Sequence, residues 1–362
     1  MQVVLKNIRA NPLAVFLIAI PLALIAQTAS LGPVWIFIFS AVSVIPLAGY
    51  IGTATESLAE HTGPKVGGLL NATLGNAAEL IITLTAIRAG LIDLVKASIT
   101  GSILGNLLLV LGFSMVTGGL RHGTQKFDRR HTSNHVVLLT LTMVALAIPS
   151  LFSQSIGKST DPKVEVLSLG VAVVMIALYV IGLIYSLKSS KSPITYEAPA
   201  KNHLRPSLKV RDAIILLAIS TLGVVWMSEL LVGVTENVVQ GLGVSEFFLG
   251  IILIPIVGNV AEHLVAVQMA LRNNMELSVE IAVSSSLQIA LFVAPLLVFI
   301  SLWLGKPLQL IFNQFELIAL GAGVLIASLV ASDGESNWLE GASLLAVYII
   351  LGLAFFLLPS LN

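Results

Sequence analysis

Two glutamates stand inside long apolar stretches of the chain, each at the end of the same five-residue pattern. The pentads Gly75-Asn76-Ala77-Ala78-Glu79 and Gly258-Asn259-Val260-Ala261-Glu262 lie 183 positions apart. A carboxylate within the hydrocarbon of a membrane is costly, so one found there is by default part of a functional site. Because the pattern occurs twice, we expect two halves of the chain to build a single site.

The pentads offer oxygen ligands for a cation. Asn76 is three residues before Glu79 and Asn259 is three before Glu262, a spacing that places side chains on one face of a helix. Carboxylate and amide oxygens are hard ligands suited to Ca²⁺ or a similar cation. Without the cation, burial and mutual repulsion favour the protonated carboxylates. Protons and metal should therefore compete for the same oxygens.

The backbone of the pentads should also be irregular. Gly75 and Gly258 are expected to loosen their helices and free backbone carbonyls, and Pro255 lacks an N–H one turn before Gly258. Unwound backbone at membrane depth is tolerated only where it lines a cavity. The glycines therefore favour a cavity beside the glutamates.

Polar side chains recur at helical spacing in the apolar stretch that follows each pentad. We predict Ser285 and Gln288 as further cation ligands or residues of the ion path, and Ser102 and Asn106 in the same role. The alternative for these four is packing and interhelical hydrogen bonding.

Other classes of function fit the residues less well. A structural ion pair would need Lys or Arg in the apolar run around either glutamate, and none is there. The chain has no cysteine and no His-Glu dipeptide, so thiol nucleophiles and the H-E-x-x-H zinc pattern are absent. Its net charge of zero excludes a nucleic-acid partner. We expect neither an enzyme nor a bound cofactor.

The composition is that of a polytopic membrane protein, with 56% hydrophobic and 10% charged residues where soluble domains have roughly 25% charged residues. Membrane-spanning helices need about 20 apolar residues. We predict eleven such helices, the first of which is retained in the protein and is not a cleaved signal peptide. The eleven expected spans are 13–29, 33–60, 66–89, 93–118, 134–153, 164–187, 211–237, 245–271, 276–303, 313–331 and 338–358.

The chain divides at the polar, basic segment 188–210, which we predict to be a cytoplasmic linker. Residues 1–32 then hold the N-terminal helix, while 33–187 and 211–362 each form a five-helix repeat. Thr55-Glu56 matches Thr235-Glu236 with an offset of 180, close to that of the pentads. An odd number of helices per repeat makes the two repeats inverted, with the site near the bilayer midplane between them.

Charge predicts the orientation in a cell membrane. With a cytoplasmic N-terminus and an external C-terminus, fourteen Lys and Arg lie inside and five outside, as the positive-inside rule requires. One basic cluster is expected to set topology and to contact anionic lipid. It consists of Arg121, His122, Lys126, Arg129, Arg130 and His131.

The stretches 75–90 (GNAAELIITLTAIRAG), 258–270 (GNVAEHLVAVQMA) and 284–290 (SSSLQIA) resemble the cation/proton exchangers, the calcium/proton branch of the calcium/cation antiporter superfamily. The resemblance covers residues 33–358. It implies an all-α fold of eleven transmembrane helices, one N-terminal helix plus two inverted five-helix repeats. It also implies Ca²⁺/H⁺ antiport with Glu79 and Glu262 as shared sites, and Asn76 and Asn259 in the same pocket.

Two departures and one alternative accompany this resemblance. Val260 stands where the family commonly has a small residue, and the linker lacks the acidic segment often found there, so regulation by such a segment is in doubt. The alternative is a sodium/calcium exchanger of the same superfamily, in which sodium would favour more Ser, Thr and Asp ligands. Selectivity among Ca²⁺, Mn²⁺ and other divalent cations, and the oligomeric state, are left open by the sequence.

Overall fold

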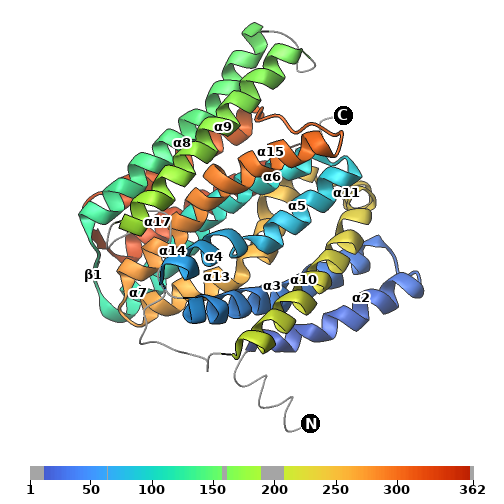
Figure 1. The fold of residues 1–362 in the computed structure, drawn as a ribbon, viewed down its shortest axis with the longest axis horizontal. Helices are drawn as coiled ribbons and strands as arrows, with labels where there is room; N and C mark the ends of the chain where they lie inside the picture. The colour runs from blue at the N-terminus through green and yellow to red at the C-terminus, as the bar shows by residue number, and fades with distance from the viewer. Residues whose placement is uncertain (1–11, 63, 157–160, 189–207, 359–362) are drawn as a thin grey trace.

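The computed structural model describes residues 12–62, 64–156, 161–188 and 208–358, and it is almost entirely helical there (Figure 1). Most of the predicted linker lies outside the described residues. The elements before the linker are η1 (Pro12–Ile18), α2 (Ala19–Thr28), α3 (Pro33–Thr62), α4 (Pro64–Leu74), α5 (Ala77–Ala89), α6 (Ile92–Leu104), the π-helical η2 (Gly105–Val110), α7 (Leu111–His122), β1 (Gln125–Lys126), α8 (Arg129–Ile156) and α9 (Pro162–Lys188).

The second half has a similar order of elements. These are α10 (Val210–Gly233), α11 (Thr235–Leu242), α12 (Glu246–Phe248), the π-helical η3 (Leu249–Leu253), α13 (Ile254–Leu271), α14 (Met275–Gln288), the π-helical η4 (Ile289–Val293), α15 (Ala294–Trp303), α16 (Gln314–Val330), β2 (Glu335–Ser336) and α17 (Trp338–Leu357).

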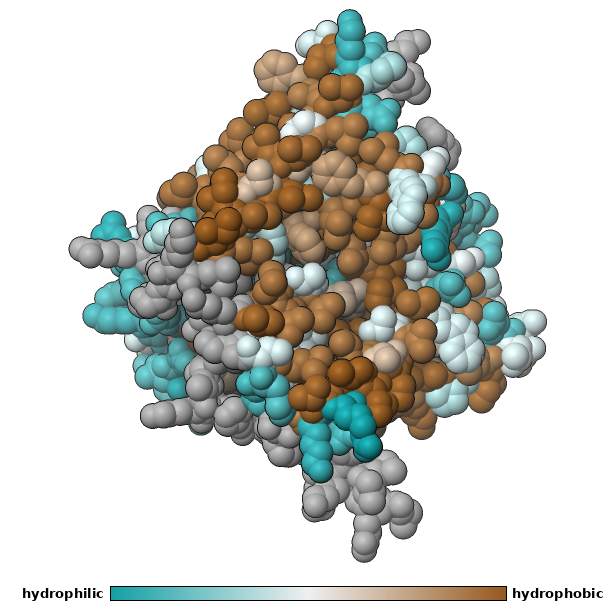
Figure 2. Space-filling view, viewed as in Figure 1, coloured by the Kyte–Doolittle hydropathy of each residue, from teal (hydrophilic) through white to brown (hydrophobic). Residues whose placement is uncertain are grey.

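Eight helical segments of the described chain are long and apolar enough to cross a membrane, and two shorter apolar helices cover Leu13–Thr28 and Gln314–Val330. Figure 2 shows a broad hydrophobic face with hydrophilic residues gathered toward its edges. The predicted span 66–89 is interrupted where loosened backbone was expected, because the chain leaves helical geometry at Gly75 and Asn76, between α4 and α5. Asn76 has φ −96° and ψ 23°, outside the helical region.

Two π-helical segments each end just before a proline. Leu249–Leu253 precedes Pro255, and Ile289–Val293 precedes Pro295. A proline inside a helix lacks a donor and clashes with the carbonyl four residues earlier. The wider π turns let each helix continue past its proline. The predicted spans 245–271 and 276–303 are therefore crossed without a break.

The two pentads lie in the middle of the molecule. Figure 1 shows α5, α6, α13 and α14 between α3 and α10 on one side and the long pair α8 and α9 on the other. Helix α13 packs against α3, α5, α7 and α14. Most of the residues in the hydrophobic part of α6–α7 and of α14–α15 are buried. Helices from both halves thus surround the residues predicted to bind the cation.

One short sheet joins the loops at one end of the bundle. Strand β1, after α7, pairs antiparallel with β2, after α16, through Gln125 with Ser336 and Lys126 with Glu335. Helices α16 and α17 each begin with a capping box, formed by Asn313 with Glu316 and by Asn337 with Glu340. These caps satisfy N–H groups that would otherwise lack a partner at the helix starts.

Candidate functional site: two glutamates and an amide cluster

The first pentad lies at the break between α4 and α5. Asn76 is the N-cap of α5, but its side chain makes no capping bond. Its Nδ2 donates instead to Oε1 of Gln288, 2.7 Å away, at the end of α14. Glu79 lies in the first turn of α5 and is 4% exposed. The break therefore leaves Asn76 free to reach the second half of the chain.

The second pentad lies within the continuous helix α13, so the expectation that Gly258 unwinds its helix is wrong. The side chain of Asn259 supports the helix here, because its Nδ2 donates to the carbonyl of Pro255, 3.1 Å away and one turn earlier. The same Nδ2 lies 3.3 Å from Oγ of Ser102 on α6. The two pentads thus have the same pattern and different backbones.

Each pentad glycine lies against the glutamate of the other pentad. A Cβ placed on Gly258 would be 3.0 Å from Oε1 of Glu79, and a Cβ placed on Gly75 would be 3.6 Å from Oε1 of Glu262. Gly258 therefore leaves room for the carboxylate of Glu79, a steric role that the sequence analysis missed, whereas a Cβ on Gly75 would be in ordinary contact with Glu262. The shared place of the two glycines in both pentads is the signal that could have revealed it.

Glu262 is held by a hydrogen-bonded chain from the neighbouring helices. Ser285 Oγ donates to Oε2 of Glu262 over 2.6 Å. Asn106 Nδ2, on η2, donates to the same Ser285 oxygen over 3.0 Å. Hydrogen bonds to ionised groups are stronger than those between neutral groups. Ser285 and Asn106 therefore fix the direction of this carboxylate when it is charged.

Four buried side-chain oxygens of this cluster accept no hydrogen bond from the residues that the structure describes. They are Oδ1 of Asn76, Asn106 and Asn259, and Oε2 of Glu79. A buried oxygen without a hydrogen-bond donor costs roughly 1–3 kcal/mol of folding free energy. Four such oxygens close together therefore suggest that a ligand binds them. A hard cation binds such oxygens.

Among the described residues, the two carboxylates have no cationic partner. Neither Glu79 nor Glu262 forms an ion pair with a described residue, and their charges are close enough to repel each other. In the described part of the chain no three His, Asp or Glu side chains form a metal cluster. Two negative charges in a buried site call for compensation by bound cations or by protons.

The hydrogen bonds of the predicted site residues form three groups, and each group joins the two halves. Asn76 contacts Gln288, Asn259 contacts Ser102, and Asn106 contacts Ser285 and through it Glu262. Glu79 lies beside Gly258 of the second pentad. That these residues bind the cation stays a prediction.

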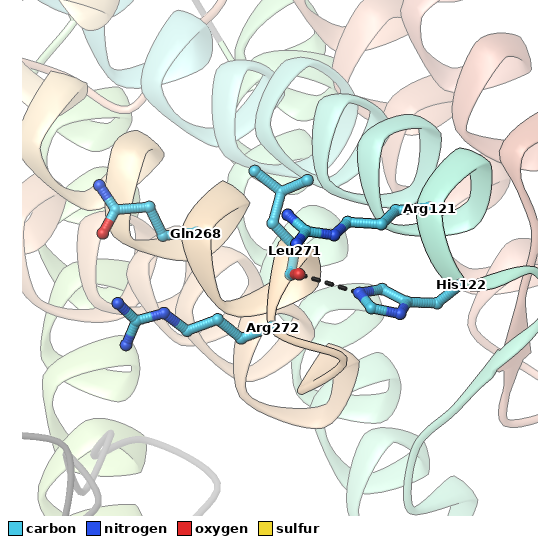
Figure 3. Close-up of a pocket in the computed structure, with 5 residues that line it drawn as sticks. All are labelled: Arg121, His122, Gln268, Leu271 and Arg272. Atoms are coloured by element: carbon cyan, nitrogen blue, oxygen red, sulfur yellow. Dashed lines mark hydrogen bonds between the residues drawn. The ribbon is translucent and has the colours of Figure 1, made fainter.

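A second polar feature lies at the surface, where α7 and α13 end. A pocket is lined there by Arg121, His122, Gln268, Leu271 and Arg272. Figure 3 shows His122 directed at the carbonyl of Leu271, with Arg272 extending from α13; the distance from His122 Nε2 to that oxygen is 2.9 Å. None of the eight predicted site residues lines this pocket.

Comparison with known proteins gives consistent matches along the chain. A family model described as "Sodium/calcium exchanger protein" matches residues 32–188 and 213–357. A Ca(2+)/H(+) antiporter of Aphanothece halophytica is 42% identical over 356 residues, covering 95% of each chain. The Ca(2+)/H(+) antiporter ChaA of Bacillus subtilis is 43% identical, covering 94% of this chain and 97% of that protein. The solved structure of native YfkE matches with a TM-score of 0.82 and 40% identity, over 95% of this chain and 100% of that one.

Proposed function

The chain belongs to the sodium/calcium exchanger protein family, and we propose that it exchanges Ca²⁺ for H⁺ across a membrane by alternating access. One observation carries the proposal: two buried carboxylates, each beside the glycine of the other pentad, lie among amide oxygens that accept no hydrogen bond from a described residue. Relatives named as Ca²⁺/H⁺ antiporters, more than 40% identical over nearly the whole chain, support the same function.

In this proposal Glu79 and Glu262 carry either one Ca²⁺ or protons. The amide oxygens of Asn76 and Asn259 complete the cation shell, since both are buried and accept no bond from a described residue. Ser285 and Gln288 act mainly by orientation, because the Ser285 hydroxyl is bonded to Glu262 and the Gln288 oxygen accepts from Asn76. No bound cofactor is required.

Ser102 and Asn106 extend the site on the side of the first half. Ser102 Oγ accepts from Asn259, and Asn106 donates to Ser285 while its own Oδ1 accepts no bond from a described residue. We assign Ser102 to the orientation of Asn259. Asn106 both orients Ser285 and offers an oxygen toward the ion path.

Coupling follows from charge. One Ca²⁺ or two protons neutralise the two carboxylates, whereas the site without either holds two negative charges away from water, which is costly. The protein is therefore disfavoured from switching between its two access states while the site is empty and doubly charged. Transport of Ca²⁺ in one direction then requires protons to return in the other. This is the physical basis of exchange rather than leak.

The alternative, sodium/calcium exchange, remains within the same family. Sodium would require further oxygen ligands at the site, and within the described residues the cluster contains two carboxylates and no third acidic side chain. Other divalent cations such as Mn²⁺ also suit these hard oxygen ligands. The two-carboxylate cluster therefore favours protons over sodium as the counter-ion.

We further propose eleven membrane spans, the broken pair α4–α5 forming one of them, in two inverted five-helix repeats with a cytoplasmic N-terminus. Contacts between loops support this order of spans, because loops assigned to the same side of the membrane meet, and the cytoplasmic side is assigned from the excess of Lys and Arg. On the cytoplasmic side β1 pairs with β2 and His122 contacts Leu271. On the external side Lys306 Nζ donates to the carbonyl of Arg88 over 2.8 Å.

The test is calcium uptake into proteoliposomes driven by an imposed pH gradient, with sodium replaced by choline. We expect uptake in both media, with an apparent calcium affinity that weakens as pH falls because protons occupy the ligand oxygens. Two competing protons allow up to about a hundredfold weakening per pH unit, and one proton about tenfold. Affinity that ignores pH and falls in sodium would instead assign sodium/calcium exchange.

A further inference from the structure

The surface pocket at the ends of α7 and α13 contains two arginines that pair with no acidic side chain of the described residues. Arg121 comes from the first half of the chain and Arg272 from the second, and both are exposed. Neither forms an ion pair with a described residue. Lys126, on the neighbouring strand β1, differs in this respect, because its Nζ lies 3.1 Å from Oε1 of Glu335. The two arginines are therefore unneutralised charges in a largely apolar molecule.

These arginines are not required to cap the end of α13. The carbonyl of Ala270 accepts from Gln125 Nε2 over 3.0 Å, and that of Leu271 is contacted by His122 Nε2. Basic side chains often stabilise the carbonyls at a helix C-terminus. Here Gln125 and His122 already do so, which leaves both guanidinium groups available to a ligand.

The pocket lies where the surface changes from apolar to basic. Leu264, Gln268 and Arg272 follow at steps of four residues, so they share one face of α13. Leu264 is 40% exposed, and Leu120 beside Arg121 is 70% exposed. Exposed apolar side chains next to cations match the boundary between lipid tails and headgroups. A ligand here would present an apolar part to the leucines and an anionic part to the arginines.

We propose that this pocket binds the phosphate of an anionic phospholipid in the cytoplasmic leaflet, a placement that rests on the orientation proposed above. Arginine pairs with phosphate through two parallel hydrogen bonds, and Arg121, Arg272 and Gln268 all line the pocket (Figure 3). The lipid bridges α7 of the first half and α13 of the second.

The experiment uses the purified full-length chain in a neutral detergent and follows its melting temperature. Short-chain phosphatidylglycerol, phosphatidylcholine and inorganic phosphate are titrated separately. The variants are Arg121→Gln with Arg272→Gln, and Lys126→Gln as the matched control, since Lys126 is already paired with Glu335. We expect phosphatidylglycerol to raise the melting temperature of the wild type and of Lys126→Gln, with a half-saturating concentration at least tenfold higher for the double variant.

Three results would overturn the proposal. The first is an equal loss in Lys126→Gln, which would mean diffuse surface charge; the second is the same shift with phosphatidylcholine. The third is the same shift with inorganic phosphate at equal concentration, which would mean a phosphate site without lipid. If the double variant is poorly folded without lipid, Gln268→Ala replaces it, and an unchanged half-saturating concentration there contradicts the proposal. Calcium exchange is not the readout, so these outcomes are independent of the proposed transport activity.

Discussion

Gly258→Ala tests whether the two pentads share one compact site. The added methyl group would lie 3.0 Å from Oε1 of Glu79 and 3.3 Å from its Cδ and Cγ. Ordinary contact begins at 3.4 Å, so the carboxylate oxygen must move by about 0.4 Å. Calcium–oxygen distances range only from about 2.3 to 2.6 Å. We therefore expect the half-saturating calcium concentration to rise ten- to a hundredfold, or about 1.4–2.8 kcal/mol.

Stability should respond differently from affinity. Alanine is favoured over glycine inside a helix by roughly 1 kcal/mol, which offsets the strain at Gly258. Gly170→Ala in α9 is the matched control, because a Cβ there meets no atom within 4 Å and the helix gains the same propensity. Both variants should fold and melt near the wild type, and only Gly258→Ala should bind calcium weakly in isothermal titration. Unchanged calcium affinity in a folded Gly258→Ala protein would refute the shared site.

Three further predictions follow from the site and the orientation. Glu79→Gln and Glu262→Gln should each abolish proton-driven calcium uptake in proteoliposomes while the protein elutes as a folded species, since Gln neither releases a proton nor neutralises the cation; near-normal uptake in either variant would remove that glutamate from the site. Ser285→Ala deletes the 2.6 Å bond to Glu262, and a bond to a charged group is worth roughly 1.5–3 kcal/mol, so calcium affinity should fall about tenfold or more by titration; an unchanged affinity would make the bond irrelevant to the cation. Single cysteines at Ser190 and Asn362, in a chain with none of its own, should label from opposite sides of intact cells, and labelling from one side would exclude the inverted repeats.

The sequence could predict which residues come together in the fold because helical spacing carries that information. Ser285 and Gln288 are three residues apart on one helix face, and the repeated pentads indicated which helices should meet. The backbone of the pentads could not be found in this way, since both begin with Gly-Asn. Tertiary contacts separate them: Asn259 bonds to Pro255 within its own helix, whereas Asn76 bonds to Gln288, 212 positions away.

The π-helical segments show a different limit. Pro255 and Pro295 are visible in the sequence and signal a disturbed helix. Periodicity alone does not distinguish a kink, a break or a π turn, because that choice depends on the packing around the proline. The sequence analysis expected loosened backbone at both pentad glycines. The helix is interrupted at Gly75, but it is continuous at Gly258, where the expectation was wrong.

The matching serines of the two halves make different hydrogen bonds. Ser102 and Ser285 are 183 positions apart, the same offset as the pentads. Ser285 donates to Glu262, whereas Ser102 accepts from Asn259, and Oε2 of Glu79 accepts no bond from a described residue. A cation entering the proposed site would therefore meet a free carboxylate oxygen on Glu79 and a restrained one on Glu262. In the proposed inverted repeats, alternating access requires two similar halves to hold unlike conformations around one site. The unequal partners of the two glutamates are such a difference at the residues proposed to bind the ions.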